Sequence, residues 1–124
     1  VDTSLPPDEY LVALGLAYIQ FARNNPEHYL LMFTNQAPEP KTATDSIEAD
    51  STFNILVRGI ERGVDVGLFH ATDAYPVLGM AYTAWGNVHG LAMLRIAHMS
   101  NVPLDLDRFE RESITTMITG LKHR

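Results

Sequence analysis

Cysteine is absent from this chain of 124 residues. Without a thiol, the sequence excludes disulfides, thiol nucleophiles and cysteine-ligated metals. Long hydrophobic runs are missing too: no apolar stretch approaches the roughly 18–20 residues that span a bilayer, and no charged-then-apolar leader is present. These absences predict a cytoplasmic protein that is not embedded in a membrane.

Basic residues are few and scattered, with 9 Lys plus Arg against 15 Asp plus Glu and a formal net charge of −6 at pH 7. DNA-binding segments usually carry a basic patch that replaces counterions on phosphates. We therefore expect this chain not to bind nucleic acid by itself. Hydrophobic residues make up 46% of the chain, but they nowhere alternate at period two for long enough to predict a sheet. One globular domain over residues 1–124 is expected.

Helical signals dominate what remains, and they predict an all-α fold of five helices. Prolines that suit a first turn stand at Pro7 and Pro26. Gly63 or Gly67 is expected to end the third helix with a left-handed C-cap. The expected N-caps and capping boxes are Asn25, Asp45 with Glu48, Asp73 and Asp105. The predicted helices span residues 7–23, 26–33, 46–66, 74–99 and 106–122, with a surface loop over residues 34–44.

The predicted helix over residues 74–99 has two different faces when it is wound at about 100° per residue. One face is bulky and aromatic, and it includes Tyr82, Trp85 and His89. The other is a stripe of small residues with three glycines, each of which costs a helix roughly 1 kcal/mol relative to alanine. A bare stripe makes sense where another helix packs closely against it.

The predicted helix over residues 106–122 carries a similar small-residue stripe. Two helices with apolar character on two sides are most economically satisfied by a symmetric homodimer, in which the last two long helices of each chain form an intersubunit four-helix bundle. The alternative is a monomer whose other helices cover these faces. The expected interface residues are Gly86, Gly90, Met93, Leu94, Ala97, Phe109, Ser113, Thr116, Met117 and Gly120.

Two segments resemble a known protein family. Residues 84–92, AWGNVHGLA, resemble the Trp…His-Gly signature of WHG-type C-terminal domains in the TetR family of transcriptional regulators. Residues 14–22, LGLAYIQFA, followed by NPEHY at residues 25–29 and by Met32-Phe33, resemble the opening pattern of the same domains. The resemblance spans nearly the whole chain in order.

The resemblance implies an effector-binding and dimerisation domain with a five-helix bundle. Members of the family are mostly repressors in which an N-terminal helix-turn-helix domain binds the operator. A small effector binds among the helices of the C-terminal domain and releases the DNA. No basic helix-turn-helix segment precedes Val1, so we expect the DNA-binding half to be absent here and operator DNA to be reached only through it. Neither a cofactor nor an enzymatic activity is expected.

The resemblance also implies a pocket for a small, mostly apolar effector between the first four predicted helices. Cavities lined by aromatic residues and methionine suit such ligands. His89 is either a structural histidine or a polar anchor for the effector. Metal binding has little support, because no two of the 5 histidines stand four residues apart. The expected pocket residues are Tyr18, Met32, Phe33, Phe53, Val57, Tyr82, Trp85 and His89, with Asn54, Arg58 and Thr83 as weaker polar candidates.

Two other functions stay open on the sequence. A purely structural dimerisation module with a filled core has the same aromatic face. A small helical enzyme or carrier needs converging ionisable groups in a cavity, whereas the sequence shows an apolar face with one histidine. Ligand binding separates a sensor from the first alternative, and turnover separates it from the second.

Overall fold

A computed structural model describes residues 1–34 and 52–124 of the chain. The described parts are helical, and they contain no strand. Within them, no helix has the length and apolar character needed to cross a membrane. The helices are α1 (Pro7–Asn24), α2 (Pro26–Thr34), α3 (Thr52–Asp65), α4 (Val77–Met93), a π-helical turn η1 (Leu94–His98) and α5 (Leu106–Lys122).

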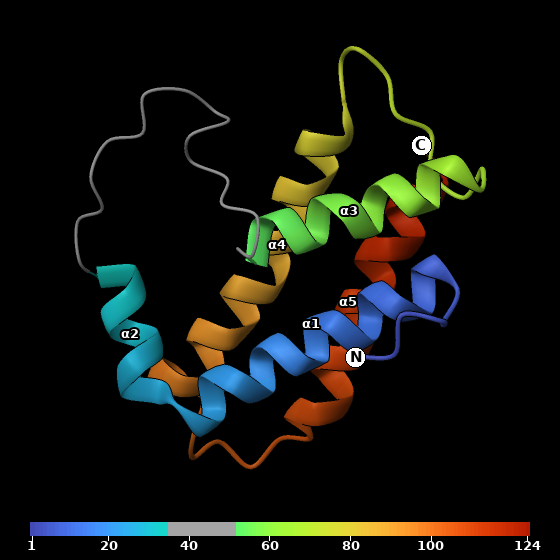
Figure 1. Ribbon diagram of the computed structural model, residues 1–124. Coiled ribbons are helices and arrows are strands. Elements are labelled where there is room, and N and C mark those ends of the chain that lie inside the picture. Colours follow the sequence, from blue (N-terminus) through green and yellow to red (C-terminus); the bar gives the residue numbers. More distant parts are fainter. Residues whose placement is uncertain (35–51) are drawn as a thin grey trace.

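Helix α1 is the central element of the bundle, because it packs against α3, α4 and α5 (Figure 1). Helix α2 stands at the C-terminal end of α1, and α3 lies across α4. The core cluster contains one fully buried large side chain from each of α1, α3, α4 and α5: Ile19, Ile60, Met80 and Ile114. This arrangement confirms the expected all-α architecture of five helices.

Local capping explains where several helices begin and end. The carboxylate of Asp105 accepts a hydrogen bond from the Arg108 backbone N–H at 3.3 Å, as predicted for the start of α5. After α3, Gly67 has a φ of +80°, which glycine adopts at little cost. The backbone N–H groups of Gly67 and Leu68 donate to the carbonyls of Val64 and Gly63, which is a Schellman C-cap. The C-cap is therefore Gly67, while Gly63 lies within the helix.

The predicted helix over residues 74–99 is wrong at its start, while helical structure continues to His98. Helix α4 begins at Val77 with Pro76 as its N-cap, and Asp73 does not cap it. The residue before a proline is disfavoured in the α conformation, so Tyr75 cannot continue a helix into Pro76. At its other end the α-helix stops at Met93, and a π turn follows.

Ion pairs join the π turn η1 to α5. The Arg95 guanidinium contacts Glu110 at 2.7 Å and Asp107 at 2.8 Å. These hydrogen bonds also raise the pKa of Arg95 against the opposing effect of burial, which is the largest single influence on it. The contacts are tertiary, so helical periodicity does not predict the wider turn. The expected capping box of Asp45 and Glu48 lies outside the described residues, as does the start of the predicted third helix.

Candidate ligand-binding site

A hydrogen-bonded cluster of aromatic side chains joins α1, α2 and α4. The Tyr29 hydroxyl donates to the Tyr18 hydroxyl at 3.2 Å and lies 2.5 Å from Nδ1 of His89. Nε1 of Trp85 also donates to the Tyr18 hydroxyl, at 3.3 Å. The rings of Tyr18 and Tyr29 meet edge to face, with their centroids 5.7 Å apart. Phe53 of α3 packs on Trp85, with the ring centroids 5.8 Å apart, so a fourth helix contributes to the cluster.

Burial sets the ionisation of this cluster. Burial lowers the pKa of His89, which favours the neutral imidazole near pH 7. Burial also raises the pKa of Tyr29, and its hydrogen bond to Tyr18 adds to the effect. The cluster is therefore a set of neutral, mutually hydrogen-bonded groups, which is the arrangement that buried polar side chains need.

A cavity of about 400 Å³ opens beside the cluster, between α1, α2, α3 and α4. Among the residues that the structure describes, no Asp, Glu, Lys or Arg lines it. Phe21 and Met32 lie at this cavity and are 43% and 52% exposed, so apolar surface faces solvent there. The lining residues are Leu14, Gly15, Ala17, Tyr18, Phe21, His28, Met32, Thr52, Ile55, Leu56 and Val88.

The expected pocket residues fall into three groups. Tyr18 and Met32 line the cavity directly. Phe53, Trp85 and His89 belong to the aromatic cluster that adjoins Tyr18. The remaining three are not placed at the cavity: Val57 is buried in the core, Tyr82 is 70% exposed, and the side chain of Phe33 lies outside the described residues.

The weaker polar candidates do not line the cavity either. Thr83 is exposed, and its hydroxyl contacts the hydroxyl of Tyr75. Arg58 and Asn54 lie on α3, but neither is among the lining residues.

Sequence reasoning missed several residues at this site. The most important is Tyr29, whose hydroxyl joins Tyr18 to His89. Tyr29 stood in the quoted resemblance pattern, so a signal was present. Leu14 and Phe21 were visible too, because they share the apolar stripe of α1 with Tyr18 at helical spacing.

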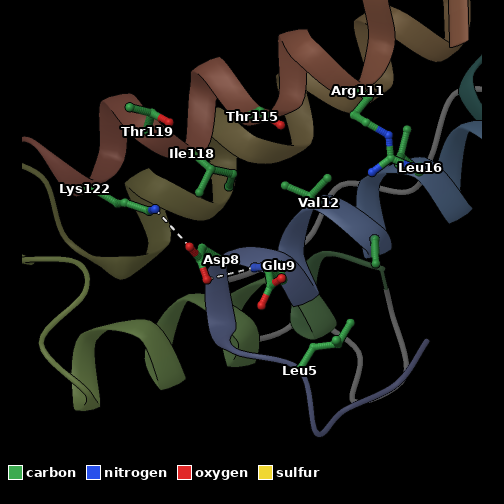
Figure 2. Close-up of a pocket in the computed structure, with 11 residues that line it drawn as sticks. Leu5, Asp8, Glu9, Val12, Leu16, Arg111, Thr115, Ile118, Thr119 and Lys122 are labelled. Carbon is green, nitrogen blue, oxygen red and sulfur yellow. Dashed lines mark hydrogen bonds and ion pairs between the residues drawn. The ribbon is translucent and has the colours of Figure 1, made fainter. Parts of the chain in front are cut away.

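A second hollow lies between α1 and α5, and it has a different chemistry (Figure 2). It measures about 610 Å³, and Asp8, Glu9, Arg111 and Lys122 all line it. Nζ of Lys122 reaches across the hollow to Oδ2 of Asp8 at 2.9 Å. None of the expected pocket residues lines this groove. Its charged walls make it solvated surface and a poor host for an apolar molecule.

The expected interface residues lie on surfaces of α4, η1 and α5 that the described chain leaves largely open. A Cβ added at Gly86, Gly90 or Gly120 meets no atom within 4 Å. Leu94 and Phe109 are 50% and 45% exposed. These three glycines are therefore not explained by packing within the described part of one chain, whereas a Cβ at Gly79, on the same stripe of α4, would lie 3.1 Å from the Tyr75 ring.

Comparison with known proteins identifies one family. The family model for the tetracyclin repressor-like C-terminal domain matches residues 11–117, which is nearly the whole chain. No curated protein and no solved structure matches the sequence. Across residues 1–34 and 52–124, no group of three or more His, Asp or Glu side chains is placed to hold a metal ion.

Proposed function

We propose that this chain, which belongs to the tetracyclin repressor-like C-terminal domain family, binds a small, mostly apolar effector in the cavity between α1, α2, α3 and α4. Domains of this family are typically regulatory, sensing ligands and dimerising, and they are typically not enzymes. The proposal therefore concerns where the effector binds and what kind of molecule it is.

The observation that carries the proposal is the lining of the cavity. Among the described residues, no formal carboxylate, ammonium or guanidinium group lines this hollow of about 400 Å³, and such a lining favours uncharged, apolar molecules. Transfer of apolar surface out of water supplies roughly 25 cal/mol per Å². The ionisable side chains that line the hollow, Tyr18 and His28, give no carboxylate and base pair for catalysis.

Tryptophan fluorescence tests this proposal, because Trp85 is the single Trp of the chain and adjoins the cavity through Tyr18. We expect N-phenylnaphthylamine, an uncharged apolar dye, to quench Trp85 saturably with one site per chain. The same dye is expected to raise the melting temperature, because it binds the folded state preferentially. Absence of saturable quenching and of any thermal shift contradicts the proposal.

We also propose that α4, η1 and α5 form the homodimer interface, as an intersubunit four-helix bundle. The open glycine stripe supports it, since close helix approach is what small residues allow. A Gly90→Leu variant is expected to weaken self-association in light scattering after gel filtration. Thr119→Leu adds a similar apolar side chain to the other side of α5, in the α1–α5 groove, and is the matched control. A wild-type monomer at micromolar concentration contradicts this part.

In a full-length protein that carries a helix-turn-helix domain, we propose that the bound effector lowers affinity for operator DNA. Such coupling requires the effector to bind one arrangement of the dimer better than another. The acidic balance of this chain, with a net charge of −6, supports assigning the DNA contacts to that other domain.

A further inference from the structure

The donor and acceptor roles within the aromatic cluster determine which hydrogen-bonding group faces the cavity. A phenol has one proton to donate. The Tyr29 hydroxyl donates its proton to the Tyr18 hydroxyl at 3.2 Å. The 2.5 Å contact between the Tyr29 hydroxyl and Nδ1 of His89 therefore needs the imidazole as donor, with the proton on Nδ1. His89 thus donates to Tyr29, and Tyr29 donates to Tyr18.

Tyr18 receives a second hydrogen bond, from Trp85. The indole N–H is a donor only, and it lies 3.3 Å from the Tyr18 oxygen. The hydrogen bonds from Tyr29 and Trp85 occupy both acceptor positions of the Tyr18 oxygen. The hydroxyl proton of Tyr18 is not used in either of them. Among the described residues, no acceptor takes the Tyr18 proton. Tyr18 also lines the cavity, which is where an acceptor from outside the chain can reach that proton.

We infer that the effector is an uncharged, mostly apolar molecule with a hydrogen-bond acceptor, such as a ketone or ester carbonyl, which accepts from the Tyr18 hydroxyl. This inference rests on the proposed function, since it describes the ligand of the same cavity. A carbonyl that leaves water for an apolar hollow must regain a hydrogen bond, and Tyr18 supplies it. A carboxylate is disfavoured because, in the part of the chain that the structure describes, no cationic Lys or Arg side chain lines the hollow to offset its desolvation.

The test compares two matched probes by calorimetry on the wild-type chain. Benzophenone and diphenylmethane have nearly the same shape, but only benzophenone has a carbonyl. Partition from water favours diphenylmethane, so any preference for benzophenone reports a polar contact. We expect benzophenone to bind about three- to tenfold more tightly, the range of one neutral hydrogen bond.

Two variants locate the contact. Tyr18→Phe removes the hydroxyl and is expected to abolish the preference while diphenylmethane still binds. Tyr82→Phe removes a hydroxyl from an exposed side chain outside the cavity lining, and it is expected to keep the preference. Benzoylbenzoate, which adds a carboxylate to the same scaffold, is expected to bind at least about tenfold more weakly than benzophenone.

The outcomes separate this inference from the proposed function. Equal affinity for benzophenone and diphenylmethane overturns the inference and leaves the cavity as an apolar site. Tight binding of benzoylbenzoate overturns the claim that the ligand is uncharged. No binding of either uncharged probe, together with no quenching by N-phenylnaphthylamine, overturns the proposed function as well. The wild-type comparison decides the acceptor even where Tyr18→Phe fails to fold.

Discussion

Helix α1 borders several hollows, and two of them have opposite character. Its C-terminal half lines the smaller one with Ala17, Tyr18 and Phe21, and no formally charged side chain of residues 1–34 or 52–124 joins them. Its N-terminal half lines the larger one with Asp8 and Glu9, opposite Arg111 and Lys122 of α5 (Figure 2). By volume alone the α1–α5 groove is the better candidate for a ligand site, since it measures about 610 Å³ and the cavity about 400 Å³. The chemistry of the lining favours the cavity as the site of an apolar ligand, because binding there does not remove water from charged side chains.

The polar groups at the two hollows also differ in how they are held. At the cavity, Tyr18, Tyr29, Trp85 and His89 form a part-buried hydrogen-bonded chain across three helices. At the groove, Asp8 and Lys122 form one ion pair with side chains that are 29% and 30% exposed. A buried network fixes the direction of each donor, whereas a solvated pair remains adjustable. Directed donors give selectivity for a ligand.

The largest expected effect comes from filling the cavity. Ala17→Phe places a phenyl group in the cavity lining and is expected to weaken binding of N-phenylnaphthylamine by at least about tenfold. Ala13→Phe is the matched control, because Ala13 lies one turn earlier on α1 and lines the groove. Fluorescence titration measures both. If both variants lose the same affinity for the dye, the cavity is not the specific binding site.

A Tyr29→Phe variant tests the network by stability. It is expected to lower the free energy of unfolding by about 1–3 kcal/mol, because it removes the buried hydroxyl that bonds both the Tyr18 hydroxyl and Nδ1 of His89. Urea unfolding followed by circular dichroism measures the change. Tyr82→Phe, in a side chain that is 70% exposed, is expected to change stability little. Similar values for both variants show that the network does not stabilise the fold.

The pH dependence of stability tests the imidazole of His89. Burial lowers the pKa of His89 in the folded state, so the unfolded state binds more protons once the pH falls toward the ordinary histidine pKa of 6.5. Stability is therefore expected to fall as the pH drops through 6.5 toward the folded-state pKa. His89→Gln is expected to flatten this slope. Unfolding curves between neutral pH and mildly acidic pH, compared for wild type and variant, give the answer. If the stability of His89→Gln depends on pH as steeply as that of the wild type, the assignment of this pH dependence to His89 is wrong.

The smallest expected effect lies at the groove. Asp8→Asn breaks the ion pair with Lys122 and is expected to cost about 0–1 kcal/mol. The hydrogen bond from Lys122 lowers the pKa of Asp8, with burial opposing it. The stabilisation is therefore present above the ordinary aspartate pKa of 3.8 and is lost as the pH falls through the folded-state pKa of Asp8. A thermal scan measures it, and a cost as large as that of Tyr29→Phe makes the two hollows energetically alike.

Most of the fold was predictable from the sequence because the signals are local. Pro7, Pro26 and Asp105 mark helix starts, and Gly67 marks an end, each through its own backbone or capping chemistry. The π turn was not predictable, because the ion pairs of Arg95 with α5 depend on tertiary packing.

The cavity was only partly predictable. Tyr18 and Tyr82 both lie on apolar helical stripes, yet one lines the cavity and the other is exposed. Helical periodicity gives the face of a residue and not what packs against that face. Tyr18 lies at the cavity because α2 brings Tyr29 and Met32 to the C-terminal half of α1, and that packing is tertiary.

Photolabelling tests the central claim most directly. Irradiated benzophenone inserts into nearby C–H bonds, and mass spectrometry of peptides then maps the label. The account predicts saturable labelling of the segment that contains Phe21 and Met32, competed by diphenylmethane. Saturable labelling of α5 around Ile118 and Thr119 places the ligand in the charged groove instead and contradicts the account.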